Sequence, residues 1–160
     1  MTGLTFHRAT LEDLELLVNT REEVLRAANG LDADADFSGV ARASRAYYRS
    51  ALQDGSHTAI LVFDGDEFVG AGGVSYYAVM PTWHNPSGRC AYIMNLYTRP
   101  SHRRRGIASR TLEMLVADAR GRGVTHIGLE ATRLGRPLYE QYGFLPAEDE
   151  MLLPEEAGKR

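Results

Sequence analysis

The sequence of 160 residues has little of what disulfide-stabilised and metal-binding proteins need. Cys90 is its only cysteine, so the chain can form no disulfide within itself and no cysteine-rich metal site. His7, His57 and His126 are widely separated along the chain, and the H-E-x-x-H spacing does not occur. We therefore expect no metal.

Long apolar runs and an excess of basic charge are also missing. No apolar stretch approaches the length of a membrane span, and residues 1–3 begin no signal-like run. We therefore expect a cytoplasmic protein with no membrane partner. The chain has 18 Lys and Arg residues against 21 Asp and Glu, a net charge of -3. This charge argues against nucleic acid as the main partner, because binding to a phosphate backbone requires a basic surface.

The composition that remains is that of an ordinary globular domain, with 44% hydrophobic and 24% charged residues. A chain of this length can bury one full core. We expect a single domain over residues 1–154 and a flexible tail over residues 155–160. Exposed strand edges in such a domain are compatible with a homodimer.

Hydrophobic periodicity predicts an α/β domain with a mixed sheet flanked by helices, in the order β-α-α-β-β-β-α-β-α-β. A capping box at Thr10 and Asp13 begins the first helix, which ends near Gly30. The later elements are expected as a helix over 40–52, strands over 59–63, from 68 and over 91–97, a helix over 107–119, a strand over 124–130, a helix over 134–142, and short strands over 144–146 and 151–153.

The glycine-rich segment 70–73 is not a dinucleotide-binding motif. It lies within a strand pattern, Ser75 breaks the spacing and no helix follows. A bulge or a close approach of another backbone explains these glycines better.

The most informative segment joins the apolar strand 91–97 to an amphipathic helix through the sequence RRRGIA at residues 103–108. Free N–H groups in the first turn of a helix, the helix dipole and neighbouring guanidinium groups all favour an anion such as a diphosphate. Gly106 would let phosphate oxygens approach the backbone. Taken alone, a solvated arginine face and a turn glycine explain the pattern equally well.

This segment resembles the acetyl-CoA-binding signature R/Q-x-x-G-x-G/A of the GNAT superfamily of N-acetyltransferases, with Arg103, Gly106 and Ala108 in the specified positions. Residues 6–14 resemble the first strand and helix of that family, and residues 136–144, RPLYEQYGF, resemble its segment after the fifth strand. Thr132 and Gly135 depart from the Asn and Ala of many members, which puts side-chain contacts with pantetheine there in doubt.

The resemblance implies that acetyl-CoA is the co-substrate. Its diphosphate would bind at Arg103, Arg104, Arg105, Gly106, Ile107 and Ala108. The backbone of the preceding strand would pair with the pantetheine amides as an added strand does, at Leu96, Tyr97 and Thr98. A backbone N–H near Asn95 or Leu96 would then stabilise the oxyanion of the tetrahedral intermediate.

Two catalytic residues are expected. Tyr139 stands where many family members carry the general acid for the CoA thiolate; packing of an apolar helix face is the other explanation. Glu130, at the end of a strand, is a candidate base, and so is His84, whose residue type titrates near neutral pH. A helix-capping or solvated Glu130, an ordinary loop histidine and proton removal through ordered water are the alternatives.

The sequence therefore predicts an N-acetyltransferase that transfers the acetyl group of acetyl-CoA to a primary amine of a small molecule or protein in a ternary complex. A non-catalytic acyl-CoA sensor or scaffold is the alternative. Residues 31–48 and 76–89 are expected to shape the acceptor pocket without identifying the acceptor. Asp32, Asp34 and Asp36 either gather a cationic amine at its mouth or only keep a linker soluble.

Overall fold

The computed structural model describes residues 3–155. Up to α4 its elements follow the order that the periodicity predicts, and a five-stranded sheet has the order β1-β2-β3-β4-β5. The pairs are antiparallel except for the parallel pair of β4 and β5. The elements are β1 (Leu4–Arg8), α1 (Leu14–Asn29), α2 (Ser38–Asp54), β2 (His57–Asp64), β3 (Glu67–Ala78), β4 (Arg89–Thr98), α3 (Ile107–Gly121), β5 (His126–Leu129) and α4 (Arg136–Tyr142), with short 3-10 helices η1 (Leu11–Asp13) and η2 (Pro100–His102).

The chain divides into two compact units, residues 1–130 and 131–160. The first contains the whole sheet with α1, α2 and α3, and the second contains α4. The mixed α/β architecture is confirmed, but the last two strands are not: residues 144–146 and 151–153 form no strand. Their apolar side chains are largely exposed, and a short apolar run forms a strand only where a neighbour offers a hydrogen-bonding edge. Of the expected tail, only Glu155 belongs to the described residues.

Local sequence signals explain where α1 begins and ends. The predicted capping box forms: the Thr10 side chain accepts the backbone N–H of Asp13, and the Asp13 carboxylate accepts the backbone N–H of Thr10. This box caps the short helix η1, which directly precedes α1. Gly30 ends α1 in the left-handed conformation at φ 59°. No helix within residues 3–155 is both long and apolar enough to cross a bilayer.

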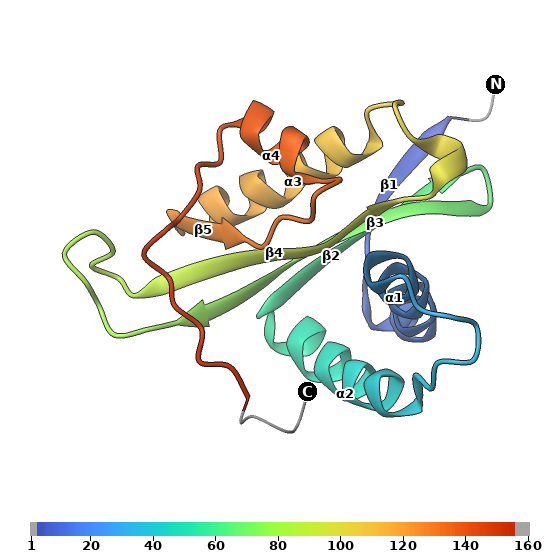
Figure 1. Ribbon diagram of the computed structural model, residues 1–160, viewed down its shortest axis with the longest axis horizontal. Helices are drawn as coiled ribbons and strands as arrows, with labels where there is room; N and C mark the ends of the chain where they lie inside the picture. The colour runs from blue at the N-terminus through green and yellow to red at the C-terminus, as the bar shows by residue number, and fades with distance from the viewer. Residues whose placement is uncertain (1–2, 156–160) are drawn as a thin grey trace. The chain divides into compact units, whose positions relative to one another are not determined.

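Helices cover both faces of the sheet in the first unit (Figure 1). Helices α1 and α2 lie on one face, and α3 lies on the other against β2, β3 and β4. The α1 side has a core that includes Leu17, Val18 and Tyr48 packed on Leu61 and Ala71. On α3, buried residues recur at helical spacing: Ile107, Thr111, Leu112, Leu115, Val116 and Ala119.

The glycines of β3 allow close approach, as the sequence indicated. A Cβ on Gly72 would lie 2.6 Å from the Thr111 Cγ2 atom of α3. A Cβ on Gly73 would lie 2.8 Å from the His57 Nε2 atom. Helix α3 and the His57 ring therefore pack directly on the backbone of β3.

Candidate functional site

Strand β4 is bulged and pairs with β5 over only part of its length. Its pairing with β5 covers Cys90 to Ile93, because β5 ends at Leu129 opposite Ile93. On the side that pairs with β3, two residues of β4, Asn95 and Leu96, lie opposite a single residue of β3. This arrangement is the bulge, and Asn95 in it has φ 60°. Within residues 3–155, no strand pairs with the β5-side edge of β4 from Met94 to Thr98. This edge is free to accept an extended ligand as a further strand.

The turn after β4 leads into α3 through two left-handed residues. Arg104 has φ 64°, and Gly106, the N-cap of α3, has φ 79°. No side chain caps this helix start, and a Cβ on Gly106 would meet no atom within 4 Å. The first N–H groups of α3 therefore face open space beside Gly106, an arrangement suited to binding phosphate oxygens.

The three arginines of this turn have different partners. The Arg105 Nη1 atom lies 3.1 Å from Asp64 Oδ2 at the end of β2, and His102 Nε2 lies 3.2 Å from the same oxygen. Arg103 reaches only the carbonyl of Thr98, at 3.4 Å. Within the described part of the chain, Arg103 and Arg104 form no ion pair, and both are exposed. Arg105 therefore fixes the loop, and the other two are available to an anion.

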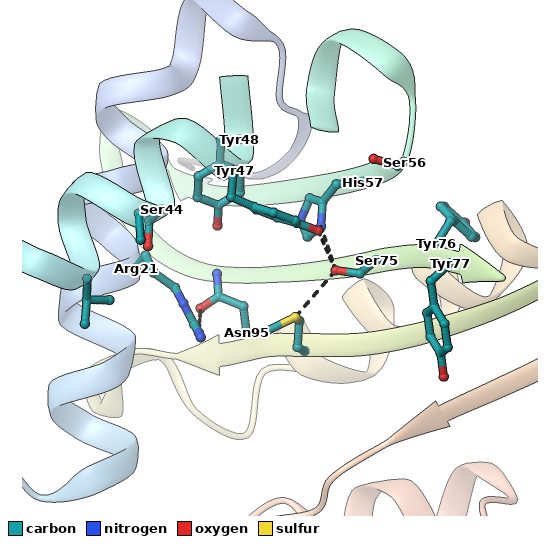
Figure 2. Close-up of a pocket in the computed structure, with 13 residues that line it drawn as sticks. Arg21, Ser44, Tyr47, Tyr48, Ser56, His57, Ser75, Tyr76, Tyr77 and Asn95 are labelled. Carbon is teal, nitrogen blue, oxygen red and sulfur yellow. Dashed lines mark hydrogen bonds between the residues drawn. The ribbon is translucent and has the colours of Figure 1, made fainter. Parts of the chain in front are cut away.

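A pocket of about 520 Å³ lies on the α1–α2 side of the sheet. Its lining comes mostly from α1, α2, β2, β3 and β4, and it reaches the bulge of β4 at Asn95 (Figure 2). Its residues include Val40, Tyr47 and Tyr48 from one predicted acceptor segment and Tyr76 and Tyr77 from the other.

His57 lies buried in the pocket wall at 5% exposure, with its ring edge-on to Tyr47 and Tyr48 at centroid distances of 5.3 and 5.5 Å. Its Nδ1 atom lies 2.9 Å from the Tyr47 hydroxyl and 3.2 Å from Ser75 Oγ. Ser75 Oγ in turn donates to the Met94 sulfur, as Figure 2 shows. Burial, together with the positive charge of Arg21, lowers the pKa of His57 to about 4, so the ring is neutral at pH 7.

Arg21 extends from α1 to the bulge of β4. Its Nη1 atom donates to Asn95 Oδ1 at 2.8 Å, and Figure 2 shows the guanidinium beside that side chain. Among residues 3–155, Arg21 makes this one hydrogen bond and no ion pair. The pocket therefore presents a guanidinium next to the place where β4 separates from β5.

The residues proposed for proton transfer lie outside this pocket lining. Glu130 follows β5 directly and is exposed, and His84 is exposed in the segment between β3 and β4. Tyr139 belongs to α4 in the second unit, where its ring contacts Phe144 at a centroid distance of 6.1 Å. Burial raises the pKa of the Tyr139 hydroxyl, which is therefore protonated at neutral pH.

The acidic segment after α1 does not contribute to the pocket lining. Asp32, Asp34 and Asp36 are exposed, and Asp36 caps the backbone N–H of Ser38 at the start of α2. Arg26 fixes the same segment through the carbonyls of Asp32 and Ala35. No group of three or more His, Cys, Asp or Glu residues within 3–155 could hold a metal ion.

Sequence reasoning did not identify Arg21, Tyr47, His57 or Ser75 as site residues. They come from four different elements, so no local motif joins them. One signal was present for Arg21, because it lies at helical spacing between the buried Leu17 and Val24, a position normally apolar.

The fold and this site define a class: a mixed sheet whose β4 diverges from β5 and leads through a glycine to an uncapped helix start is a GNAT-type fold. The model of the acetyltransferase (GNAT) family matches residues 23–144, and the chain belongs to this family. This membership supports an acyltransferase.

Solved structures agree. A predicted acetyltransferase with acetyl-CoA from Clostridium acetobutylicum is 28% identical over 95% of this chain and 96% of its own, with a TM-score of 0.87. A GCN5-related N-acetyltransferase from Ralstonia eutropha JMP134 is 31% identical over 95% and 98%, with a TM-score of 0.83. An aminoglycoside N-acetyltransferase in complex with CoA, 13% identical over 97% and 96% with a TM-score of 0.73, shares the fold. No curated protein matches the chain.

Proposed function

We propose that the protein transfers the acetyl group of acetyl-CoA directly to a primary amine of a small molecule or protein within a ternary complex. One observation carries this proposal: a single strand, β4, borders both an unpaired edge leading to the Gly106 loop and the pocket under α1 and α2. The Clostridium relative with acetyl-CoA supports the choice of donor.

In this proposal acetyl-CoA, the acetyl donor, binds along β4 and the loop at residues 103–108. Its diphosphate binds the N–H groups of Gly106, Ile107 and Ala108 with Arg103 and Arg104, while Arg105 holds the loop through Asp64. Its pantetheine amides pair with the backbone at Leu96, Tyr97 and Thr98. The thioester then lies beside the bulge, where a backbone N–H of Asn95 or Leu96 stabilises the oxyanion.

The amine attacks the thioester carbonyl directly, and no acyl-enzyme forms. Cys90, the only cysteine, is 2% exposed, and its sulfur contacts the Asn85 side chain and the Gly88 carbonyl. A buried thiol in such surroundings is a poor nucleophile for acetyl-CoA. Direct attack requires both substrates to be bound at once, which the two sides of β4 permit.

Collapse of the tetrahedral intermediate expels the CoA thiolate, which takes a proton from the general acid, Tyr139, assigned by the family resemblance. The attacking amine loses its proton to Glu130, His84 or ordered water. His57 does not serve as this base, because a group with a pKa of about 4 is too weak to deprotonate an ammonium near neutral pH.

Initial-rate kinetics test the proposal. Thiol release is measured while acetyl-CoA and a series of primary amines are varied together, and a ternary complex gives intersecting reciprocal plots. Cys90→Ser, the control for an acyl-cysteine, should keep the wild-type kcat. Parallel plots with loss of activity in Cys90→Ser would contradict direct transfer. Binding of acetyl-CoA without turnover of any amine would favour the alternative, a sensor or scaffold module.

A further inference from the structure

The pocket under α1 and α2 carries positive charge and no negative charge. Arg21 is the one charged side chain among its thirteen lining residues, which include no Asp or Glu. The acidic residues of α1 are bound by other arginines: Glu15 by Arg45, Glu22 by Arg26 and Glu23 by Arg99. This pocket would repel a purely cationic acceptor and attract an anionic group.

Arg21 also occupies an unusual position. It shares the inward face of α1 with Leu17 and Val24, which are 2% and 5% exposed. A guanidinium held there loses part of its hydration, yet its only hydrogen bond within residues 3–155 uses one of five N–H donors. The remaining donors suit a carboxylate, which binds arginine through two parallel hydrogen bonds.

Apart from Arg21, the pocket lining is mostly apolar and aromatic, with a few neutral polar groups such as Ser44 and Ser75. Tyr47 and Tyr48 from α2, Tyr77 from β3 and Met94 from β4 contribute to its walls. Such walls suit a compact hydrocarbon or aromatic body. Arg21 lies directly beside Asn95, the residue of the bulge, so a carboxylate bound to Arg21 lies close to the proposed thioester position.

We propose that the acceptor is a small amine that carries a carboxylate, with an amino acid of apolar or aromatic side chain as the best fit, and that Arg21 binds this carboxylate. This assignment rests on the proposed function and specifies its substrate class. In an α-amino acid a single carbon separates the amine from the carboxylate, which places the nitrogen near the bulge while the side chain contacts the tyrosines. Polycationic amines and lysine-rich protein segments are poor acceptors on this reasoning.

Three acceptors test the assignment without any variant: phenylalanine, phenylalanine amide and phenethylamine. They share the aromatic body and differ at the carboxylate, which is present, masked or absent. We expect the wild-type kcat/KM for phenylalanine to exceed that for either analogue by about 10-fold or more. Phenylalanine amide has a less basic amine than phenylalanine, so more of it is present as the reactive free base. This difference alone would favour the amide, and a preference for phenylalanine would therefore be due to the carboxylate.

Arg21→Met and Arg21→Lys then connect the preference to one residue. Arg21→Met should raise KM for phenylalanine by about 10- to 100-fold and leave KM for phenethylamine and for acetyl-CoA near the wild-type values. Arg21→Lys keeps the charge but not the planar fork and should fall between them. Arg49→Met removes an exposed arginine of α2 outside the pocket lining and should change none of the three acceptors. Melting temperatures check that each variant is folded.

Failure of the acceptor assignment and failure of the proposed function would give different results. Equal turnover of the three acceptors by the wild type, or a preference for phenethylamine or for a polyamine such as spermidine, would overturn the carboxylate assignment and leave the N-acetyltransferase intact. An unchanged ratio between phenylalanine and phenethylamine in folded Arg21→Met would overturn the role of Arg21. Absence of thiol release with every amine would contradict the proposed function, and the acceptor assignment with it.

Discussion

Protonation of His57 should destabilise the folded protein in mild acid. The ring is buried between two tyrosines, and its pKa falls from 6.5 to about 4 on folding because burial and Arg21 oppose the imidazolium. Between these two values the unfolded chain holds a proton that the folded chain does not. The free energy of unfolding therefore rises with pH through this window, and the stability is lost as the pH falls from 6.5 towards 4.

The size of the effect follows from the shift. The fall of the His57 pKa from 6.5 to about 4 is worth about 3 kcal/mol when fully expressed, and about 2 kcal/mol of it falls between pH 7 and pH 4.5. Asp118 and Glu23 have pKa values lowered below the ordinary carboxyl range, so the stability that they add is lost mainly at more acidic pH.

Urea denaturation of the wild type and of His57→Asn measures this effect. Asparagine replaces the Nδ1 hydrogen bonds without an ionisable group, and the unfolding free energies are compared at several values from pH 4.5 to pH 7 at constant ionic strength. The wild type should lose about 2 kcal/mol more of its unfolding free energy than the variant across this range. Parallel curves for the two proteins would refute the assignment of a depressed His57 pKa.

Three further predictions concern the loop, the proposed general acid and the packing of β3. Gly106→Ala should weaken acetyl-CoA binding in calorimetry by about 10-fold or more, because the added methyl group crowds the proposed phosphate site. Gly55→Ala is the control, because Gly55 has φ 80° against 79° at Gly106 and the substitution carries the same backbone strain of about 1–2 kcal/mol. The Gly55→Ala variant should bind acetyl-CoA normally. Equal affinities would move the phosphate site elsewhere. Tyr139→Phe should lower kcat by about 10- to 100-fold with unchanged acetyl-CoA affinity; equal kcat values with chemistry rate-limiting would leave Tyr139 a packing residue. Gly72→Ala should lower the free energy of unfolding by about 1–3 kcal/mol in urea denaturation. Adding Thr111→Ser removes the methyl group that the new Cβ would meet, and should restore part of that loss. No recovery would show that contact with Thr111 is not the cause.

The features that sequence could predict are those set by neighbouring residues. The start of α3 after RRRG and the end of α1 at Gly30 both follow from local conformational demands. The conformation of the loop at residues 103–108 was therefore predictable from six consecutive residues, and its role in binding the donor stays a prediction.

The pocket could not be predicted in the same way. Arg21, Tyr47, His57 and Ser75 meet only when α1 and α2 pack on the sheet, and the depressed pKa of His57 exists only in that packed state. The two strands expected after residue 143 failed for a related reason, since an apolar run specifies a strand only when a partner edge is available.

The placement of β4 between the proposed donor and acceptor sites has an evolutionary consequence. The proposed donor contacts come from residues 96–108, whereas the pocket wall comes from residues 21–95, and the two meet at the bulge. If the proposed assignments hold, substitutions in α1 and α2 change the acceptor while the proposed acetyl-CoA contacts stay intact. A library confined to pocket positions such as Arg21, Ser44 and Tyr47 would therefore vary the proposed acceptor site and keep the residues of the proposed donor site unchanged.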